Sequence, residues 1–396
     1  MISVDEALER ILKSITVLGN ERIPLAQSFG RTLGEDVRAH LSNPAFDVSA
    51  MDGYAVRAND VQPGVTLAMI GASQAGAGFA GTVGPGQCVR IFTGAPVPSG
   101  ADAVIMQEEA RAQEDAITFE CDVAAGRSIR FQGDDFSDGD VLVATGLILD
   151  PRKIALAAAG NVADVTVARQ PRVTLLATGN ELVQPGSVVG PDQIVASNSV
   201  GLDAFFSGHG AAVSDYGIVA DDKRVLGEAL AKALDEKPDI LLTTGGASVG
   251  EHDFVQEMLR TNGVDIDFWR IAMRPGKPLM FGRRGETIVF GLPGNPVSAL
   301  VTARMFVLPA VLAMMGAKAP FPLYLPLAND IPPNGPRRHF LRGRLISDAA
   351  HGARVEPVRQ TDSGHLSSLA SADVLIVQNE NCPGKSSGDI VATHKL

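Results

Sequence analysis

Apolar residues near the start of the chain recur at the spacing of one helix face. These residues are Val4, Ala7, Leu8, Ile11, Leu12 and Ile15. Ser3 and Glu6 precede this face as a Ser-x-x-Glu capping box, in which each side chain accepts the other residue's free backbone N–H. The pattern predicts an amphipathic helix that begins just after Ser3.

The pattern changes between residues 44 and 150, where short apolar runs alternate with glycine-containing turns. The runs are Val89–Phe92, Val104–Met106, Ile117–Phe119 and Val141–Ala144. Runs of this length, rich in β-branched residues and bounded by turn signals, are typical of strands. This segment therefore predicts a mostly β domain, followed by a second helix that starts at Pro151.

Strand-like and helix-like segments alternate between residues 172 and 316. The expected strands are Val173–Ala177, Val213–Val219, Ile240–Thr243 and Thr287–Phe290. The expected helices are Ser197–Phe206, Asp221–Leu234, Asp253–Arg260 and Pro296–Met315. Such alternation predicts right-handed βαβ units and an α/β domain with a doubly wound parallel sheet. Its ligands should bind outside the carboxyl ends of the strands.

The chain beyond Pro320 is rich in proline and glycine, and its short β runs predict a small β-barrel or sandwich of about 75 residues. A length of 396 residues agrees with such a division, because domains commonly contain about 100–200 residues.

The charge balance excludes some classes of partner. With 34 basic and 45 acidic residues, the formal net charge is −11, which argues against nucleic acid and anionic membranes as partners. Cys88, Cys121 and Cys382 form no Cys-x-x-Cys pair and are odd in number, so neither a disulfide framework nor a cysteine zinc site fits them. Reduced cysteines and the absence of a signal-peptide pattern favour a cytoplasmic enzyme.

Carboxylates follow three of the predicted strands. Glu181 follows the first, Asp221 the second and Asp253 the third. An aspartate before a helix is commonly an N-cap, which is the structural alternative for Asp221 and Asp253 taken singly. Three carboxylates at one edge would repel one another, and a Mg²⁺ ion that bridges them to phosphate oxygens would remove that cost.

A glycine-rich loop and a group of cations lie in the same domain. Gly245, Gly246, Ser248 and Gly250 follow a strand and precede a helix, where backbone N–H groups can bind a phosphate, although an ordinary tight turn has the same pattern. Arg270, Arg274 and Lys277 suit oxyanions, or form a solvated basic turn. Asn295 stands at an N-cap position before Pro296, the first residue of the last helix.

Two further positions lie in the predicted β domain. Asp52 precedes a glycine, so an Asx-turn is its simplest interpretation, and Thr93 also lies in a turn-like sequence. Neither sequence alone distinguishes a structural turn from a functional site.

In their order and spacing, these segments resemble the molybdopterin molybdenumtransferase family, that is, the bacterial MoeA proteins and the related E-domain of gephyrin. The matching motifs are Asn43-Pro44, Ser49-Ala-Met-Asp-Gly-Tyr54, Phe92-Thr-Gly-Ala-Pro96, Arg130 with Gly133-Asp-Asp135, Thr178-Gly-Asn-Glu-Leu182, Ser197-Asn198, Gly245-Gly-Ala-Ser-Val-Gly250 with Asp253, Arg274-Pro-Gly-Lys-Pro278, Leu292-Pro-Gly-Asn-Pro-Val-Ser298, Phe340-Leu-Arg342 and Ser363-Gly-His-Leu-Ser-Ser-Leu369. The resemblance extends over nearly the whole chain.

The resemblance implies a four-part, elongated homodimer. Residues 1–45 and 141–170 would form a helical dimerisation domain, 46–140 an inserted β domain, 171–318 an α/β domain similar to molybdopterin adenylyltransferases, and 319–396 a C-terminal β-barrel. Asp52, Thr93 and Asp135 of one subunit would face Glu181, Asp221 and Asp253 of the other.

The resemblance also implies the reaction. Adenylylated molybdopterin and molybdate would react with Mg²⁺ present, release AMP and leave molybdenum on the pterin dithiolene. Glu181, Asp221 and Asp253 would hold the metal, the glycines of 245–250 the pterin phosphate, and the three cations the anionic oxygens. Arg342 and Ser363 would contact molybdate. A molybdopterin adenylyltransferase and acceptor apoenzymes are the partner proteins expected.

Two departures from the family pattern and two alternative functions remain. Asn180 replaces a common aspartate, which puts a metal role at that position in doubt, and Arg270 and Arg274 stand where lysine is frequent. One alternative is a molybdopterin adenylyltransferase, against which the inserted β domain argues. The other is a non-catalytic, gephyrin-like scaffold, against which the full set of acids argues.

Overall fold

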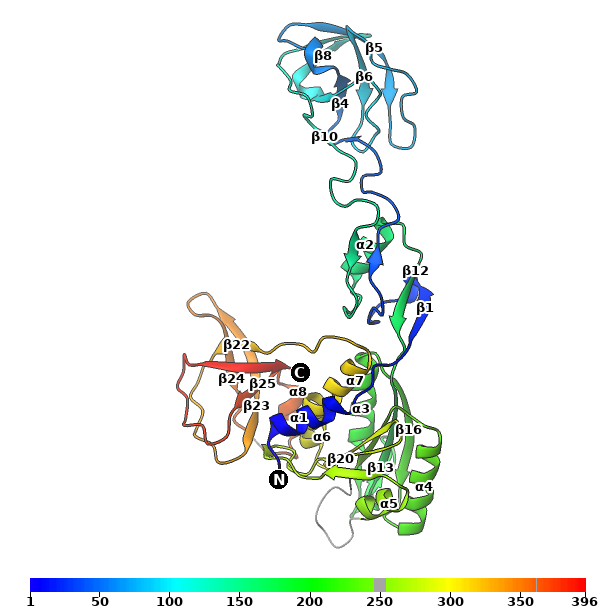
Figure 1. The fold of residues 1–396 in the computed structure, drawn as a ribbon. Coiled ribbons are helices and arrows are strands. Elements are labelled where there is room, and N and C mark those ends of the chain that lie inside the picture. The colour runs from blue at the N-terminus through cyan, green and yellow to red at the C-terminus, as the bar shows by residue number, and fades with distance from the viewer. Residues whose placement is uncertain (246–253, 361) are drawn as a thin grey trace.

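The chain is elongated, as Figure 1 shows for a computed structural model of the protein. The structure describes residues 1–245, 254–360 and 362–396. The β-rich segment 46–140 lies at one end, and the α/β part and the C-terminal β part lie together at the other (Figure 1). A narrow middle segment joins them.

The α/β part contains a six-stranded sheet. Its strands, in spatial order, are β16 (Ala212–Val219), β13 (Arg172–Thr178), β17 (Ile240–Thr244), β21 (Thr287–Leu292), β20 (Met280–Arg284) and β18 (Asp265–Phe268). The first four strands are parallel, as predicted, but β20 runs antiparallel to both of its neighbours, β21 and β18. The expectation of a wholly parallel sheet was therefore wrong at this edge. The cause is local: only Gly285 and Glu286 separate β20 from β21, and so short a loop can join only antiparallel strands.

Helices cover both faces of this sheet, and each predicted helix that the structure describes is present. They are α3 (Ser197–Gly208), α4 (Lys223–Asp235), α5 (Val255–Thr261), α6 (Pro296–Thr302) and α7 (Leu308–Met314). The last two were expected as one helix, but a π-helical turn, η4 (Ala303–Val307), separates them. Pro309 has no backbone N–H, and this interrupts the regular hydrogen-bond ladder at that point.

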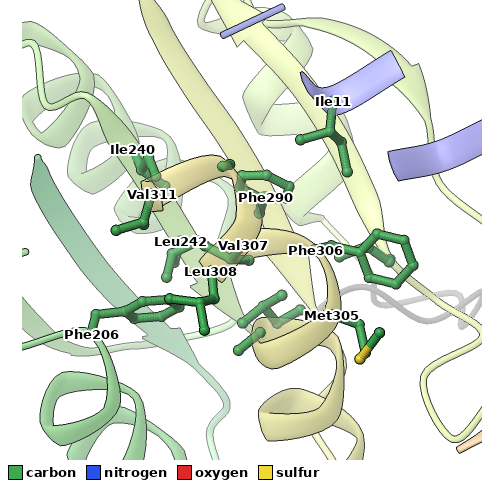
Figure 2. Close-up of a cluster of buried hydrophobic side chains, with 14 of the residues drawn as sticks. Ile11, Phe206, Ile240, Leu242, Phe290, Met305, Phe306, Val307, Leu308 and Val311 are labelled. Atoms are coloured by element: carbon green, nitrogen blue, oxygen red, sulfur yellow. The ribbon is translucent and has the colours of Figure 1, made fainter. Parts of the chain in front are cut away.

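The segment from α6 through α7 is the centre of the main core. Residues 296–314 are long and apolar enough to cross a membrane by composition, but 78% of the segment is buried inside the protein, as in a core helix. Figure 2 shows Phe306, Val307 and Leu308 packed among side chains from the sheet, such as Leu242 and Phe290.

The N-terminal helix α1 (Val4–Lys13) begins where the sequence predicts, with the Ser3 hydroxyl accepting from the backbone N–H of Glu6. Its apolar face does not form a separate helical domain. Val4, Ala7 and Ile11 are buried in the same core as Phe306 (Figure 2). The periodicity predicted the buried face correctly, but the α/β part is what covers it.

The middle segment is mostly extended rather than helical, which corrects the expectation of a helical part. It has one helix, α2 (Pro151–Ala159), capped by Asp150, and a 3-10 turn, η1 (Leu25–Gln27). Its strand pairs are β1 (Asn20–Pro24) with β12 (Asp164–Ala168), and β2 (Val37–Arg38) with β11 (Val141–Val143). The pairs bury valines of the strands in a small core of their own.

The β-rich segment at the far end forms a second six-stranded sheet. The order is β7 (Ala103–Met106), β4 (Gly53–Val56), β6 (Gln87–Ile91), β5 (Thr66–Ser73), β9 (Ala116–Phe119) and β8 (Ala110–Gln113). Below it, β3 (Val48–Ser49) pairs with β10 (Ile129–Arg130). Two 3-10 turns, η2 (Ala58–Asp60) and η3 (Gln107–Glu109), complete the segment.

The C-terminal part is a curved β-sheet with one short helix. Its strands are β22 (Leu323–Pro326), β23 (Arg338–Asp348), β24 (Gly352–Pro357), β25 (Val374–Gln378) and β26 (Ile390–Lys395), and α8 (Leu366–Ala370) contacts α6. A bridge between Leu327 and Val355 brings the chain after β22 beside β24. The α/β part contributes β19 (Met273–Arg274), which pairs with β23, so that the two parts share a sheet.

Candidate functional site

The carboxyl ends of β13 and β16 bring three polar residues together. The backbone N–H of Asp221 donates to the Asn180 side-chain oxygen at 3.1 Å, and the backbone N–H of Asn180 donates to an Asp221 carboxylate oxygen at 3.4 Å. Asn180 therefore ties the two strand ends together, which explains an amide at this position. Glu181 is exposed beside them.

Two glycines allow the backbone to close tightly at this edge. A side chain on Gly179 would lie 2.7 Å from a carboxylate oxygen of Glu181, so this carboxylate lies against the backbone. Gly245 has φ of +88°, and a Cβ there would lie 2.4 Å from the carbonyl oxygen of Thr178. The end of β17 thus fits against the end of β13 only because residue 245 is glycine. The predicted residues Gly246, Ser248, Gly250 and Asp253 lie outside the described residues.

Buried oxygen atoms accompany these strand ends. In the described part of the chain, Thr178 Oγ1, Thr243 Oγ1 and Asn198 Oδ1 have no hydrogen-bond partner. The Asn198 amide donates to the Gly294 carbonyl at 2.7 Å, which fixes its oxygen. Such oxygens are commonly satisfied by a ligand or water. Asn198 was not among the predicted site residues. The available signal was a polar residue in the first turn of a helix at the ligand-binding edge.

The loop before α6 connects this edge to the C-terminal part. Pro296 starts α6, as predicted, but the Asn295 side chain makes no capping bond. Instead, its amide donates to the Ser363 hydroxyl at 2.9 Å. The buried Arg342 donates to the carbonyls of Gln360 at 2.5 Å and Asp362 at 3.0 Å. Arg342 therefore holds the turn that presents Ser363.

The three predicted cations lie around β19: Arg270 precedes it, Arg274 ends it and Lys277 follows it. Arg270 stacks over the ring of Trp269 at 5.4 Å, while Arg274 and Lys277 are exposed. In residues 1–245, 254–360 and 362–396, none of the three forms a salt bridge with a carboxylate. Burial lowers the pKa of Arg342, the charge of Asp362 opposes this effect, and the charge of Arg274 adds to it. The charges of Arg274 and Arg342 thus act on one another.

The β-rich segment holds a second group of predicted residues. Thr93 donates to one Asp52 carboxylate oxygen from its backbone N–H at 2.7 Å and from its hydroxyl at 2.8 Å. These bonds, and the charge of Arg90, lower the pKa of Asp52. Asp135 accepts from the Asn43 amide at 3.1 Å.

A cavity of about 560 Å³ lies beside these residues. It is lined by Asn43, Pro44, Val48, Gly94, Arg130, Asp134 and Asp135. The cavity combines two carboxylates with one arginine, so it can accept both cationic and anionic groups. Arg130 was part of the family pattern but not of the predicted site.

The two groups are not brought together within one chain. Asp52, Thr93 and Asp135 belong to the part at one end of Figure 1, whereas Glu181, Asp221 and the cations belong to the other end. Among the residues that the structure describes, no three His, Cys, Asp or Glu side chains are grouped so that they could hold a metal ion.

Comparisons with known proteins identify the family. Residues 2–160 match the MoeA N-terminal region (domain I and II), 174–313 a probable molybdopterin binding domain, and 324–396 the MoeA C-terminal region (domain IV). The molybdopterin molybdenumtransferase of Haemophilus influenzae is 38% identical over 80% of this chain and 79% of its own length. Molybdopterin molybdenumtransferase 2 of Mycobacterium tuberculosis is 36% identical over 95% of both chains.

A solved structure supports the same assignment over the whole chain. The molybdopterin biosynthesis MoeA protein of Pyrococcus horikoshii OT3 superposes with a TM-score of 0.86 at 29% identity and covers all of both chains. Since the sequence matches and this fold agree from end to end, the chain belongs to the MoeA family of molybdopterin molybdenumtransferases.

Proposed function

We propose that this chain is a molybdopterin molybdenumtransferase of molybdenum cofactor biosynthesis. It takes adenylylated molybdopterin and molybdate, releases AMP and leaves molybdenum on the pterin dithiolene. The relatives named for this activity match most of the chain, which supports the assignment. The observation that carries the proposal is a series of polar contacts that leads from Asn198 at the strand ends, through Asn295 and Ser363, to Arg342.

This series can be followed residue by residue. Asn198 bonds to Gly294, the neighbouring Asn295 bonds to Ser363, and Arg342 holds the turn next to Ser363. A substrate with a phosphate at one end and an oxyanion at the other would lie along this line. Gly245 and the glycines that follow it bind the pterin phosphate through backbone N–H groups. Arg270, Arg274 and Lys277 neutralise anionic oxygens, while Ser363 and Arg342 contact molybdate.

We also propose that the strand-end carboxylates hold Mg²⁺. Glu181 and Asp221 supply the hard oxygen ligands that this ion prefers, at an edge that also carries the buried oxygen of Asn198. Asp253, outside the described residues, is the third proposed ligand. When bound, the ion would polarise the phosphoanhydride of the substrate.

A homodimer would complete the site. Asp52, Thr93 and Asp135 belong to the part at one end of the chain, and Glu181 and Asp221 to the part at the other (Figure 1), so we propose that a second copy brings the two groups into one cleft. Isologous dimers of this kind form two equal sites. We propose that the enzyme acts in the cytoplasm, receives its pterin from a molybdopterin adenylyltransferase and passes its product to acceptor apoenzymes.

Two alternatives make different predictions. An adenylyltransferase would form adenylylated molybdopterin from ATP, and a gephyrin-like scaffold would turn over neither substrate. Mass spectrometry of the ligand that co-purifies with the protein distinguishes the two enzymes. The molybdenum-bearing product supports our proposal, whereas the adenylylated pterin alone is a ligand of both enzymes.

The direct test measures AMP release from adenylylated molybdopterin with molybdate and Mg²⁺. Glu181→Gln and Asp221→Asn should each lose most of the rate, because the ionised carboxylates are removed while similar shapes remain. Asp215→Asn, an exposed aspartate of β16 outside the site, serves as the matched control. Unchanged AMP release in both site variants contradicts the carboxylate assignment, and Mn²⁺ binding measured by EPR tests the metal separately.

A further inference from the structure

A second cavity, of about 610 Å³, lies in the C-terminal part, and the proposed reaction uses only one of its lining residues, Arg274. Its wall includes three arginines, Arg274, Arg337 and Arg359, together with His339 and Gln378. Cavities of this volume are typical of small-molecule sites.

The cavity lies on the opposite face of β23 from Arg342. Side chains alternate along a strand, so His339 and Leu341 share one face, while Phe340 and Arg342 share the other. Phe340 belongs to the core shared with the α/β part, whereas His339 and Leu341 line the cavity. Arg274 is the register neighbour of His339 and therefore lies on the cavity face. Apart from Arg274, the cavity contains none of the proposed substrate-binding residues.

The charges around the cavity are unbalanced. Arg274, Arg337 and Arg359 form no ion pair and no side-chain hydrogen bond with any other residue that the structure describes. The acid on the wall, Asp330, already accepts from the backbone N–H of Ser387 at 2.7 Å. Three like charges around one space repel one another, and an anion between them removes this cost.

His339 gives a second, independent indication. It is 9% exposed, and no hydrogen bond of its ring to the described residues is present, although it lines the cavity. Burial, followed by the charges of Arg274, Arg342 and Arg337, lowers its pKa to about 4. A neutral ring can donate one hydrogen bond to a ligand oxygen without an added charge.

The wall opposite β23 is held in place before any ligand binds. The Asn334 amide donates to the carbonyls of Arg337 at 3.1 Å and Asn379 at 2.8 Å, and its oxygen accepts from the backbone N–H of Cys382 at 2.8 Å. The Gln378 amide donates to the Pro332 carbonyl at 2.7 Å. Prolines at 332, 333 and 336 restrict this loop further. These contacts hold the loop that carries Arg337 in one conformation, which lowers the entropic cost of binding a ligand.

We propose that this cavity binds a tetrahedral oxyanion through Arg337 and Arg359, at a site distinct from the one that carries out molybdenum transfer, with Arg274 at the border of both. Guanidinium groups match the geometry of such anions and bind them with two parallel hydrogen bonds. The oxyanion can be free inorganic phosphate or the phosphate of a nucleotide, and the volume accommodates either. The inference stands apart from the proposed function, because its test needs no turnover.

The experiment measures binding of inorganic phosphate and of AMP to the full-length protein by equilibrium dialysis. The test variant is Arg337→Gln with Arg359→Gln in one chain, and the single variants accompany it. Arg111→Gln in the distant β-rich segment removes an arginine charge without touching the cavity and is the control. A thermal unfolding profile like that of the unmodified protein establishes that each variant folds.

The expected result is saturable binding to the unmodified protein and to Arg111→Gln, with affinity at least about 10-fold weaker in the double variant, since two charge-assisted contacts are lost. Phosphate binding that the double variant weakens identifies a free oxyanion as the ligand of the cavity, and weakened binding of AMP alone identifies a nucleotide. The ring signal of His339 in an NMR spectrum should shift with the same affinity. Equal binding to all variants, or none to the unmodified protein, overturns the proposal.

Discussion

Thr93 donates two hydrogen bonds to a single carboxylate oxygen of Asp52, from its backbone N–H at 2.7 Å and its hydroxyl at 2.8 Å. Both bonds favour the ionised form, and together with the charge of Arg90 they lower the pKa of Asp52. The Asx-turn expected from Asp52-Gly53 is therefore replaced by a contact that spans 41 residues. Asp52 is kept as an anion, in the state that a metal- or substrate-binding role requires.

Removal of the Thr93 hydroxyl should raise the pKa of Asp52. Thr93→Val keeps the shape of the side chain and the backbone bond, but it removes one of the two donors. An NMR titration of the Asp52 carboxyl should therefore show a higher pKa than in the unmodified protein. The remaining bond from the Thr93 backbone N–H should still keep this pKa below its ordinary value. Thr118→Val, on an exposed part of the same sheet, should leave it unchanged. An unaltered pKa in Thr93→Val would show that the hydroxyl bond is not formed in solution.

Gly245 should tolerate substitution less well than another glycine of the same conformation. Gly245→Ala must accommodate a Cβ at 2.4 Å from the Thr178 carbonyl and a φ of +88°. Gly186 has φ of +87° with open space around it, so Gly186→Ala carries only the backbone strain, about 1 kcal/mol. We expect a loss of about 2–4 kcal/mol for Gly245→Ala, because the two strand ends must also separate. Urea unfolding, followed by hydrogen exchange in β13 and β17, measures the loss of unfolding free energy in the two variants. Equal losses in Gly245→Ala and Gly186→Ala would contradict the predicted clash.

His339 should make the C-terminal part less stable at mildly acidic pH. Its folded-state pKa, about 4, lies below the unfolded value near 6.5, so the unfolded chain binds a proton first as the pH falls. The neutral ring of His339 therefore makes its full contribution to the free energy of unfolding above pH 6.5, and this contribution is lost as the pH falls toward 4. By pH 5 the free energy of unfolding is lower by about 2 kcal/mol.

The measurement compares hydrogen exchange of the β23 and β25 amides at pH 7 and pH 5 in the unmodified protein and in His339→Gln. Carboxylates elsewhere also titrate, and the difference between the two proteins removes their contribution. The variant should show a smaller acid-induced loss. The same loss in both proteins would mean that His339 is not desolvated as the structure indicates.

The main elements of this fold were predictable because their signals are local. The apolar runs in the α/β part predicted β13, β16, β17 and β21, since a buried strand needs such a run wherever it pairs. The strands β18 and β20 were not predicted, and β20 runs against the parallel strands because direction depends on the connection and not on the strand. Likewise, the apolar face of α1 was evident, but a periodicity does not say which part of the chain will cover it.

The site was predictable in its residue types but not in its contacts. Carboxylates at strand ends and the turn at Arg274 to Lys277 follow from topology, so the sequence could identify them. The roles of Asn180 and Asn295 depend on partners 41 and 68 residues away, and both asparagines tie segments together. No local pattern encodes such pairings. The cavity around His339 is formed in the same way, by segments that only the folded chain brings together.

The proposed shared site predicts that two inactive variants will restore activity when they are combined. Asp52→Asn removes a carboxylate from one half of the site and Asp221→Asn from the other. If each site takes Asp52 from one subunit and Asp221 from its partner, a mixed dimer contains one site with both changes and one with neither. Random mixing makes half of the dimers mixed, so AMP release should recover to about a quarter of the unmodified rate.

The mixture must be prepared by unfolding and refolding the two variants together, so that subunits exchange. Each variant refolded alone is the control and should stay inactive. Glu181→Gln provides a further test of which residues share a half of the site. Mixed with Asp52→Asn, it should restore activity. Mixed with Asp221→Asn, it should not, because Glu181 and Asp221 belong to the same half. Recovery in neither mixture would place all of these residues in one chain's own site and would contradict the shared arrangement that the elongated chain in Figure 1 suggests.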